Sequence, residues 1–206
     1  MKELVLVGDI HGKVREFLAL IKPYLNKGNT IIQLGDFGFG FIKIEDLPEG
    51  VKLIRGNHDG PKEAREHKAY LGDYGTICNK KVFFLSGAFS IDWEWRIPGA
   101  SWWPDEELSQ QELQAAIDFY ADRKPEIVLT HEAPASVIPL VLRNFMLRPY
   151  KKPCMDSRTS QALQAMLDIH QPKQWFFGHH HISCQYQVQN TAFRCLSELE
   201  LTKIKL

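Results

Sequence analysis

Side chains that commonly bind divalent metals recur in five short fragments of this chain, at residues 8–12, 35–38, 56–59, 130–132 and 178–181. Asp and His are standard ligands of Zn²⁺, Mn²⁺ and Fe²⁺, and the neutral oxygen of Asn also suits harder ions. One catalytic ion needs about three protein ligands, so the larger set in this chain predicts a centre of two metals. The candidate metal ligands are Asp9, His11, Asp36, Asn57, His131, His179 and His181.

The spacing of these residues suggests how two ions would share them. Asp9 and His11 are two residues apart, so on an extended segment both side chains point the same way and reach one ion. His179 and His181 repeat this spacing, and the carboxylate of Asp36 can bridge two ions. Two metals ~3.5–4 Å apart clamp the attacking and the leaving oxygen of an in-line displacement, and they lower the pKa of a bound water.

Two further histidines lie beside these candidate ligands. His58 follows Asn57 and would face away from the metals, where it is placed to protonate a leaving alkoxide as a general acid. His180 alternates away from His179 and His181. We interpret it as a residue that either supports the ligands or is exposed.

Short apolar runs precede the five fragments and predict buried strands, each of which ends at a candidate ligand. The runs cover residues 4–7, 30–34, 51–54, 126–130 and 174–177. Helical spacing of apolar residues predicts helices over 14–25, 105–120 and 160–170, whereas 81–90 reads as two strands joined near Gly87 and the tail after Val188 is β-rich. The pattern predicts an α/β fold in which the carboxyl ends of the strands bring the ligands to one edge of the sheet.

A tryptophan-rich segment separates two of the ligand-bearing fragments. Residues 91–104 hold four of the five tryptophans and follow no consistent period, which predicts an ordered loop. Because functional residues often lie on loops positioned by a rigid scaffold, our hypothesis is that residues 93–104 form one wall of the substrate site.

Composition limits the partners and the location that we expect. The 206 residues fall within the range of one domain, and the 25 basic and 25 acidic residues leave no large basic face for duplex nucleic acid. The four cysteines are widely spaced without a CxxC pair, which indicates reduced thiols. No signal peptide and no apolar run of ~18 residues is present, so we expect a cytoplasmic protein without a membrane span.

The ordered set of fragments, from residue 8 to residue 181, resembles the calcineurin-like metallophosphoesterase superfamily. The resemblance implies one domain over residues 1–206, folded as a four-layer α/β/β/α sandwich with a dimetal site at the C-terminal ends of the strands. It implies two divalent metal ions, Mn²⁺ first, with Fe, Zn²⁺ and Ni²⁺ as alternatives.

The resemblance also implies roles for individual residues. The first metal would be held by Asp9, His11, Asp36 and His181. Asp36 would bridge to the second metal, which Asn57, His131 and His179 complete. Asn57 and His58 would contact the substrate, and His58 would protonate the leaving group.

The chain departs from one branch of the superfamily, the serine/threonine protein phosphatases. After the bridging Asp, that branch places an Asp that orients the acid histidine and an Arg that grips phosphate. Phe39 and Gly40 stand at these positions here, so another residue must supply positive charge. An Arg can grip phosphate in bidentate fashion, and Arg96 is the first candidate and Arg158 the second.

These features predict a dinuclear-metal phosphoesterase that hydrolyses a phosphate ester by direct attack of a metal-bridging hydroxide. We expect a phosphomonoesterase acting on a small-molecule or peptide phosphoester, such as a nucleotide or a phosphoprotein. One alternative is a phosphodiesterase for cyclic nucleotides or short nucleic acid, in which the tryptophans stack on a base. The other is a metal-binding scaffold without activity, although such members usually lose ligands that this chain keeps.

Overall fold

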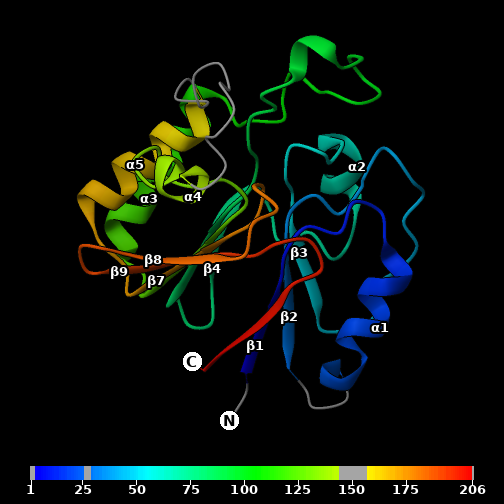
Figure 1. Ribbon diagram of the computed structural model, residues 1–206, viewed down its shortest axis with the longest axis horizontal. Coiled ribbons are helices and arrows are strands. Elements are labelled where there is room, and N and C mark those ends of the chain that lie inside the picture. Colours follow the sequence, from blue (N-terminus) through cyan, green and yellow to red (C-terminus); the bar gives the residue numbers. More distant parts are fainter. Residues whose placement is uncertain (1–2, 26–28, 144–156, 206) are drawn as a thin grey trace.

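Two β-sheets pack face to face in the computed structural model, which describes residues 3–25, 29–143 and 157–205 (Figure 1). The first sheet has the strand order β10-β1-β2-β3, in which β1 to β3 are parallel and β10 is antiparallel to β1. The bounds of its strands are Leu201–Lys205 (β10), Glu3–Val7 (β1), Thr30–Leu34 (β2) and Val51–Ile54 (β3).

The second sheet has the order β4-β5-β6-β7-β9-β8, with four parallel strands between two antiparallel edges. Its strands are Tyr74–Ile77 (β4), Val82–Leu85 (β5), Ile127–Thr130 (β6), Gln174–Phe177 (β7), Thr191–Cys195 (β9) and Cys184–Val188 (β8).

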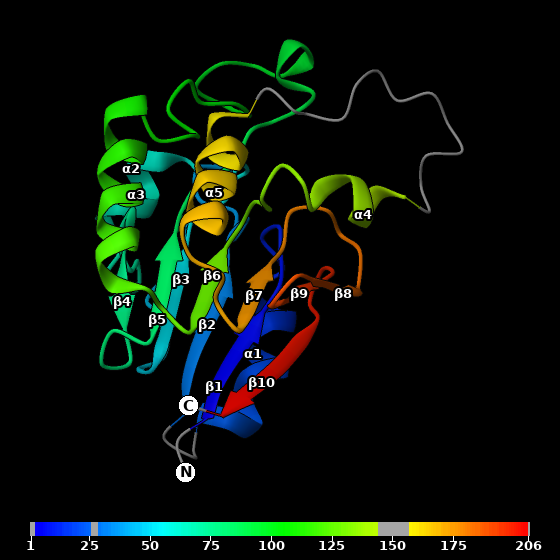
Figure 2. The same ribbon diagram turned by 90° about the vertical axis from the view of Figure 1, so that its left-hand side faces the viewer.

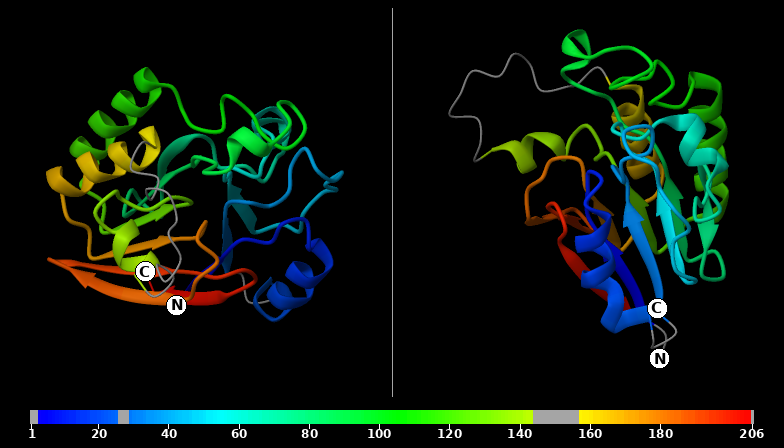
Figure 3. Two further views of the ribbon diagram at one scale, coloured as in Figure 1. Left: turned by 45° about the horizontal axis from the view of Figure 1, so that its top comes forward. Right: turned by 90° about the vertical axis from the view of Figure 1, so that its right-hand side faces the viewer.

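Helices cover the outer face of each sheet. On the first sheet lie α1 (Val14–Leu25), seen in front in the right panel of Figure 3, and the short α2 (Pro61–Glu66). On the second lie α3 (Gln110–Arg123), α5 (Arg158–Ile169) and the short α4 (Ile138–Leu142) (Figure 2). None of the helices in the described ranges is long and apolar enough to span a bilayer.

Alternation along the strands explains the layers. Leu4 and Leu6 of β1 pack between the two sheets, whereas Val5 and Val7 point the other way, into the core under α1. The second sheet divides in the same manner, with Phe176 between the sheets and its neighbours on β7 under α3 and α5. The layer order is therefore α/β/β/α, which confirms the predicted fold class.

Three sequence-based expectations about elements need correction. Residues 81–90 contain one strand, β5, whose hairpin partner is β4 rather than a strand after Gly87. Helix α3 begins later than expected, because Ser109 and Glu112 form a reciprocal capping box that fixes its start at Gln110. The candidate ligands follow strands of two sheets, not one, so they meet where the carboxyl ends of β1, β2 and β3 face those of β6 and β7.

The loop between β5 and α3 carries the tryptophan-rich segment and projects at the top of Figure 1 (green). It contains a short 3₁₀ helix, η1 (Trp93–Trp95), in an otherwise irregular course. Of the cysteines, Cys78, Cys184 and Cys195 are free thiols, and Cys154 lies outside the described residues.

Candidate metal centre

Tight turns at the strand ends, rather than extended segments, position the candidate ligands. The amides of Ile10 and His11 both donate to the carbonyl of Asp36, which joins the turn after β1 to the turn after β2. Four of the candidate ligands have left-handed backbones, a conformation that costs free energy for residues other than glycine. They are His11 (φ 44°), Asp36 (φ 58°), His179 (φ 68°) and His181 (φ 54°).

Two glycines let these turns approach one another closely. A Cβ atom at Gly56 would lie 2.2 Å from Oδ1 of Asp36, and one at Gly178 would lie 2.2 Å from Oδ1 of Asp9. Because real Cβ contacts are never that short, any side chain at either position would displace a candidate ligand.

The first group of ligands comprises Asp9, His11, Asp36 and His181, whose donor atoms all lie within 4.8 Å of one another. Nε2 of His181 is 3.1 Å from Oδ2 of Asp9 and 2.8 Å from Nε2 of His11. Nε2 of His11 is in turn 3.8 Å from Oδ2 of Asp36. Two carboxylates and two imidazoles in this arrangement match the ligand chemistry of a divalent transition metal.

A buried oxygen without a hydrogen bond supports that match. Asp9 is fully buried; its Oδ1 accepts from the amide of His179, whereas its Oδ2 lies 3.1 Å from Nε2 of His181 without a hydrogen bond of good geometry. A buried carboxylate oxygen needs a donor or a cation because its desolvation is otherwise uncompensated.

The second group comprises Asp36, Asn57, His131 and His179. Nδ1 of His131 lies 2.7 Å from the carbonyl of Leu34, so this nitrogen carries the hydrogen and donates. Nε2 of His131 is then directed at Oδ1 of Asp36, at 3.2 Å, and at Oδ1 of Asn57, at 3.3 Å. Asp36 lies between the groups, one carboxylate oxygen facing each, as a bridging ligand requires.

Electrostatics make the second group attractive to positive charge. Burial alone would lower the pKa of His131, but the carboxylates of Asp36 and Asp9 raise this pKa to about 10. Burial likewise opposes the ionised form of Asp36, yet His131 holds the pKa of that carboxyl well below its usual range. A cation at this place would meet the buried carboxylate of Asp36 in its ionised form.

Glu132, which directly follows the candidate ligand His131 in the chain, orients His179. Its Oε2 lies 3.4 Å from Nε2 of His179, while Nδ1 of the same ring faces Oδ1 of Asn57 at 2.9 Å. Burial alone would raise the pKa of Glu132. This pKa is instead lowered to about 2 by the nearby rings of His179 and His180 and by the amide of Ala133. A carboxylate behind a ligating imidazole is the usual device that fixes its orientation and tautomer.

His180 and His181, the two histidines that follow His179, have separate environments. His180 lies with its Nε2 3.4 Å from Oε1 of Glu132, in accord with a supporting position. His181 belongs to the first group and His179 to the second, so the inference from spacing that both reach one ion is wrong. Their left-handed backbones explain the difference, since the rule of alternating side chains holds only for extended chain.

Asp59 is a second residue whose role was missed. Its buried carboxylate holds the turn after β2 against the turn after β3 by accepting four backbone hydrogen bonds. The donors are the amides of Phe37, Gly38, Phe39 and Gly56, at 2.7–3.1 Å. Its place in the Gly-Asn-His-Asp fragment was the only signal in the sequence.

His58 lies at the rim of the two groups, where it meets Arg96. The amide of His58 donates to Oδ1 of Asp36 at 2.7 Å, and its ring lies edge-on to His11. Arg96 places Nη2 2.7 Å from Nε2 and Nη1 3.2 Å from Nδ1 of His58. Burial lowers the pKa of His58, and the positive charge of Arg96 lowers it further.

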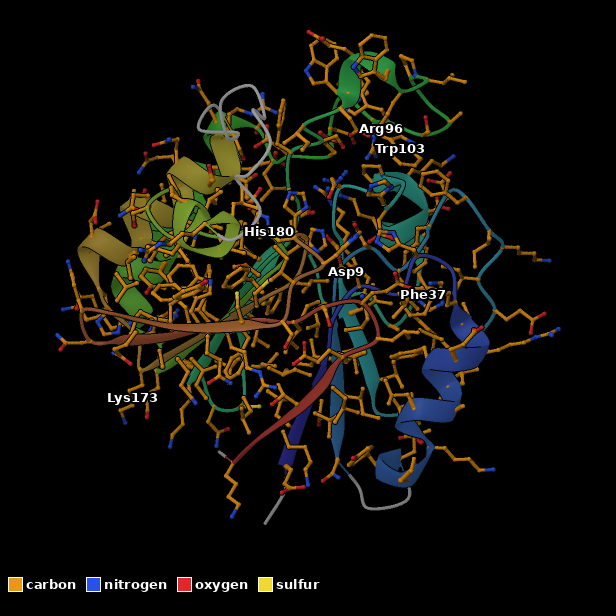
Figure 4. The ribbon with its side chains drawn as sticks, in the orientation of Figure 1. Asp9, Phe37, Arg96, Trp103, Lys173 and His180 are labelled. Carbon is orange, nitrogen blue, oxygen red and sulfur yellow. The ribbon has the colours of Figure 1, made fainter. Side chains whose placement is uncertain are left out.

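Arg96 is itself held in place. Its Nε donates to Asp92 at 2.7 Å and its Nη1 to the carbonyl of Ser101 at 3.3 Å. Figure 4 shows Arg96 beside Trp103 on the same side of Asp9. Arg158, the second candidate for phosphate binding, is 45% exposed and pairs with Glu107.

Comparison with known proteins places this geometry in a family. The model of the calcineurin-like phosphoesterase family matches residues 3–183, and no curated protein matches the chain. One similar solved structure is a conserved uncharacterized protein of Streptococcus pneumoniae TIGR4, described as a predicted phosphoesterase, with 13% identity and a TM-score of 0.47 over 99% of this chain and 83% of that one. Another is GAP50, the anchor in the inner membrane complex of Plasmodium, with 11% identity and a TM-score of 0.48 over 95% of this chain and 71% of that one. Because the family model covers most of its length, the chain belongs to the calcineurin-like phosphoesterase family.

Proposed function

We propose that this protein is a metal-dependent phosphomonoesterase. One observation carries the proposal. The two ligand groups have Asp36 in common, and the Arg96–His58 pair lies at the rim of both groups. When bound, two divalent cations supply a nucleophile at neutral pH and neutralise charge on the phosphate. Mn²⁺ is the first metal to test, followed by Fe, Zn²⁺ and Ni²⁺.

The side chains of the chain then have distinct tasks. Asp9, His11 and His181 hold one cation, and Asn57, His131 and His179 hold the other. Arg96 binds phosphate oxygens through its two terminal nitrogens, and this contact draws it from the ring of His58. With the positive charge of Arg96 moved to the phosphate, His58 takes up a proton and, as imidazolium, gives it to the leaving oxygen. The displacement in this proposal is direct and forms no covalent phosphoenzyme.

Hydrolysis of p-nitrophenyl phosphate and bis-p-nitrophenyl phosphate with added Mn²⁺ tests the proposal directly. We expect turnover of the monoester that is lost in Asp36→Asn, because this substitution weakens the bridge between the two groups. If neither ester is hydrolysed, the two remaining interpretations are a very selective enzyme and a metal-binding scaffold, and a metal count by mass spectrometry then separates them.

An aromatic surface beside His58 favours a second candidate, activity on a nucleotide or a nucleotide diester. Phe41 is 45% exposed, its ring centroid is 6.1 Å from that of His58, and its ring meets Trp103 edge-on at 5.3 Å. A positive φ at Gly40 and the lack of a Cβ atom there let the indole of Trp103 lie against the backbone. Exposed aromatic rings of this kind stack on bases.

A matched pair of substrates separates these candidates. Adenosine 5′-monophosphate and ribose 5-phosphate have the same leaving oxygen and differ by the base, so a preference for the nucleotide that Phe41→Ala abolishes supports base stacking. Equal turnover of both compounds would assign the protein to small phosphomonoesters in general. Preference for bis-p-nitrophenyl phosphate over the monoester would instead support the phosphodiesterase.

A further inference from the structure

We propose that Ser90 and Glu106 are positioning residues that fix the amide orientation of Asn57 and thereby set the affinity of the second ligand group for its metal. This role rests on the proposed dinuclear site. It concerns two residues that are neither metal ligands nor substrate contacts in that proposal.

A continuous chain of buried hydrogen bonds links the three residues. Nδ2 of Asn57 lies 3.1 Å from Oγ of Ser90, and Oγ of Ser90 lies 2.6 Å from Oε2 of Glu106. The amide of Ser90 also donates to Oε1 of Glu106 at 2.7 Å. All three side chains belong to residues that are at most 3% exposed, so water does not compete for these bonds.

The direction of the hydrogen bonds determines which end of the Asn57 amide faces the metal group. Above its pKa of about 7, Glu106 is an ionised carboxylate that only accepts, so the hydroxyl hydrogen of Ser90 is used on Glu106. Oγ of Ser90 then accepts from its other partner, which requires the NH₂ end of Asn57 at that position. The carbonyl oxygen of Asn57 is left to face His131 and His179, at 3.3 and 2.9 Å.

The reverse orientation would be unfavourable for metal binding. It would direct the NH₂ of Asn57 at the second group, where a donor with partial positive charge repels a cation and offers no lone pair. Without Ser90 and Glu106, the amide loses the contact that distinguishes its two ends. Loss of a residue that orients a metal ligand through a hydrogen bond typically changes metal affinity by roughly 10–100-fold.

The same bonds close the base of the tryptophan-rich loop. Ser90 and Glu106 stand at its two ends, and Arg96 lies between them in the chain. The loop therefore contacts the site twice, through Asn57 at its base and through His58 near its tip. Its base acts on the second group only, since the first group contains no partner of Ser90 or Glu106 among the described contacts.

Calorimetric titration of the metal-stripped protein with Mn²⁺ at a pH of about 8, where Glu106 is ionised, tests the role without any substrate. We expect two binding events in the wild type. In Ser90→Ala and Glu106→Gln the affinity of one event should fall roughly 10–100-fold while that of the other is unchanged. Ser90→Thr retains the hydroxyl and should restore the weakened event, which a merely structural role for the loop would not explain.

Matched controls separate this effect from general loss of stability. Ser101→Ala removes a hydroxyl that accepts from Ile97 in the same loop, and Glu107→Gln changes the adjacent buried carboxylate that caps α5. Both should bind two Mn²⁺ ions normally. If Ser90→Ala fails to fold by circular dichroism, Glu106→Gln carries the test.

The outcomes distinguish this role from the function on which it rests. A wild type that binds a single Mn²⁺ ion overturns the dinuclear proposal, and the role of Ser90 and Glu106 with it. A wild type that binds two ions, with folded variants that match it in both affinities, overturns only the role proposed for Ser90 and Glu106.

Discussion

Arg96 lies against His58 with both of its terminal nitrogens, although the two residues are 38 positions apart in the chain. A neutral imidazole accepts a hydrogen bond at one nitrogen only, so at most one of these two contacts is a hydrogen bond. Asp92 holds the guanidinium through Nε, which leaves its terminal nitrogens directed at the rim of the site. The pair thus places positive charge where Phe39 and Gly40 supply none.

Removal of Arg96 should impair substrate binding and turnover together. In Arg96→Ala we expect kcat/KM for p-nitrophenyl phosphate to fall roughly 10- to 100-fold, because charge-assisted hydrogen bonds to phosphate contribute about 1.5–3 kcal/mol. Arg158→Ala is the matched control and should match the wild type, since Arg158 is engaged with Glu107. Unchanged kinetics in Arg96→Ala would remove Arg96 from phosphate recognition.

The general-acid role of His58 predicts a dependence on the leaving group. His58→Ala should slow hydrolysis of an alkyl phosphate such as glycerol phosphate far more than hydrolysis of p-nitrophenyl phosphate, because p-nitrophenolate leaves without a proton. The ratio of the two kcat values in the variant and in the wild type measures this effect. An equal loss on both substrates would assign His58 to phosphate binding instead.

The fold could be predicted from the sequence wherever an apolar run coincided with one buried strand. β2, β3 and β7 match the expected ranges residue for residue, since each is buried along almost its whole length and is mostly apolar. β4 was missed because its four residues are only half-buried and show no alternation. Its turn into β5 uses left-handed Cys78, Asn79 and Lys80 without a glycine to mark it.

The candidate site also has residues that could be predicted from the sequence and residues that could not. Ligand types and their order along the chain pointed to the two groups, because each ligand follows its own strand. The residues that orient the ligands gave no local signal: Ser90 reaches Asn57 across 33 positions, and its partner Glu106 is 16 positions further on. Roles that depend on a partner in another element become visible only once the elements are packed.

Glu132 provides a test of how His179 is oriented. Glu132→Gln keeps the shape of the side chain but removes the charge that faces Nε2 of His179, so the affinity of the second group for Mn²⁺ should fall roughly 10- to 100-fold. Calorimetric titration of the metal-stripped protein measures this. Glu126→Gln, which changes an exposed carboxylate paired with Lys173, is the control and should bind as the wild type does. Equal affinities in Glu132→Gln and the wild type would argue against an orienting role.

Asp59 should matter for stability more than for chemistry. In Asp59→Asn one of the two carboxylate oxygens becomes an NH₂ group, and two buried backbone amides lose their acceptor. Each unsatisfied donor costs about 1–3 kcal/mol, so the free energy of unfolding should fall by roughly 2–6 kcal/mol. Urea denaturation measures the loss, and Asp122→Asn at an exposed site of α3 is the control. A decrease below about 0.5 kcal/mol, the usual size of a surface substitution, would show that the two turns hold together without Asp59.

Glu106 predicts the pH dependence of stability. Burial raises the pKa of Glu106 to about 7, and the negative charge of the nearby Glu107 adds to the rise, whereas the hydrogen bonds from Ser90 oppose it. Arg55 donates to the backbone carbonyl of Glu106 rather than to its carboxylate. The pKa of an unfolded Glu is about 4.3, so the folded protein holds a proton that the unfolded chain has released between these two values. The stabilising contribution is complete below pH ~4.3 and is lost as the pH rises through the folded pKa. Glu106→Gln lacks this pH-dependent contribution. As the pH increases from about 5 to about 8, the free energy of unfolding of the wild type should therefore decrease relative to that of Glu106→Gln. Urea denaturation of both proteins across this range, with a chelator to remove metals, measures the difference, and parallel pH profiles would place the ionisation of Glu106 outside the folding equilibrium.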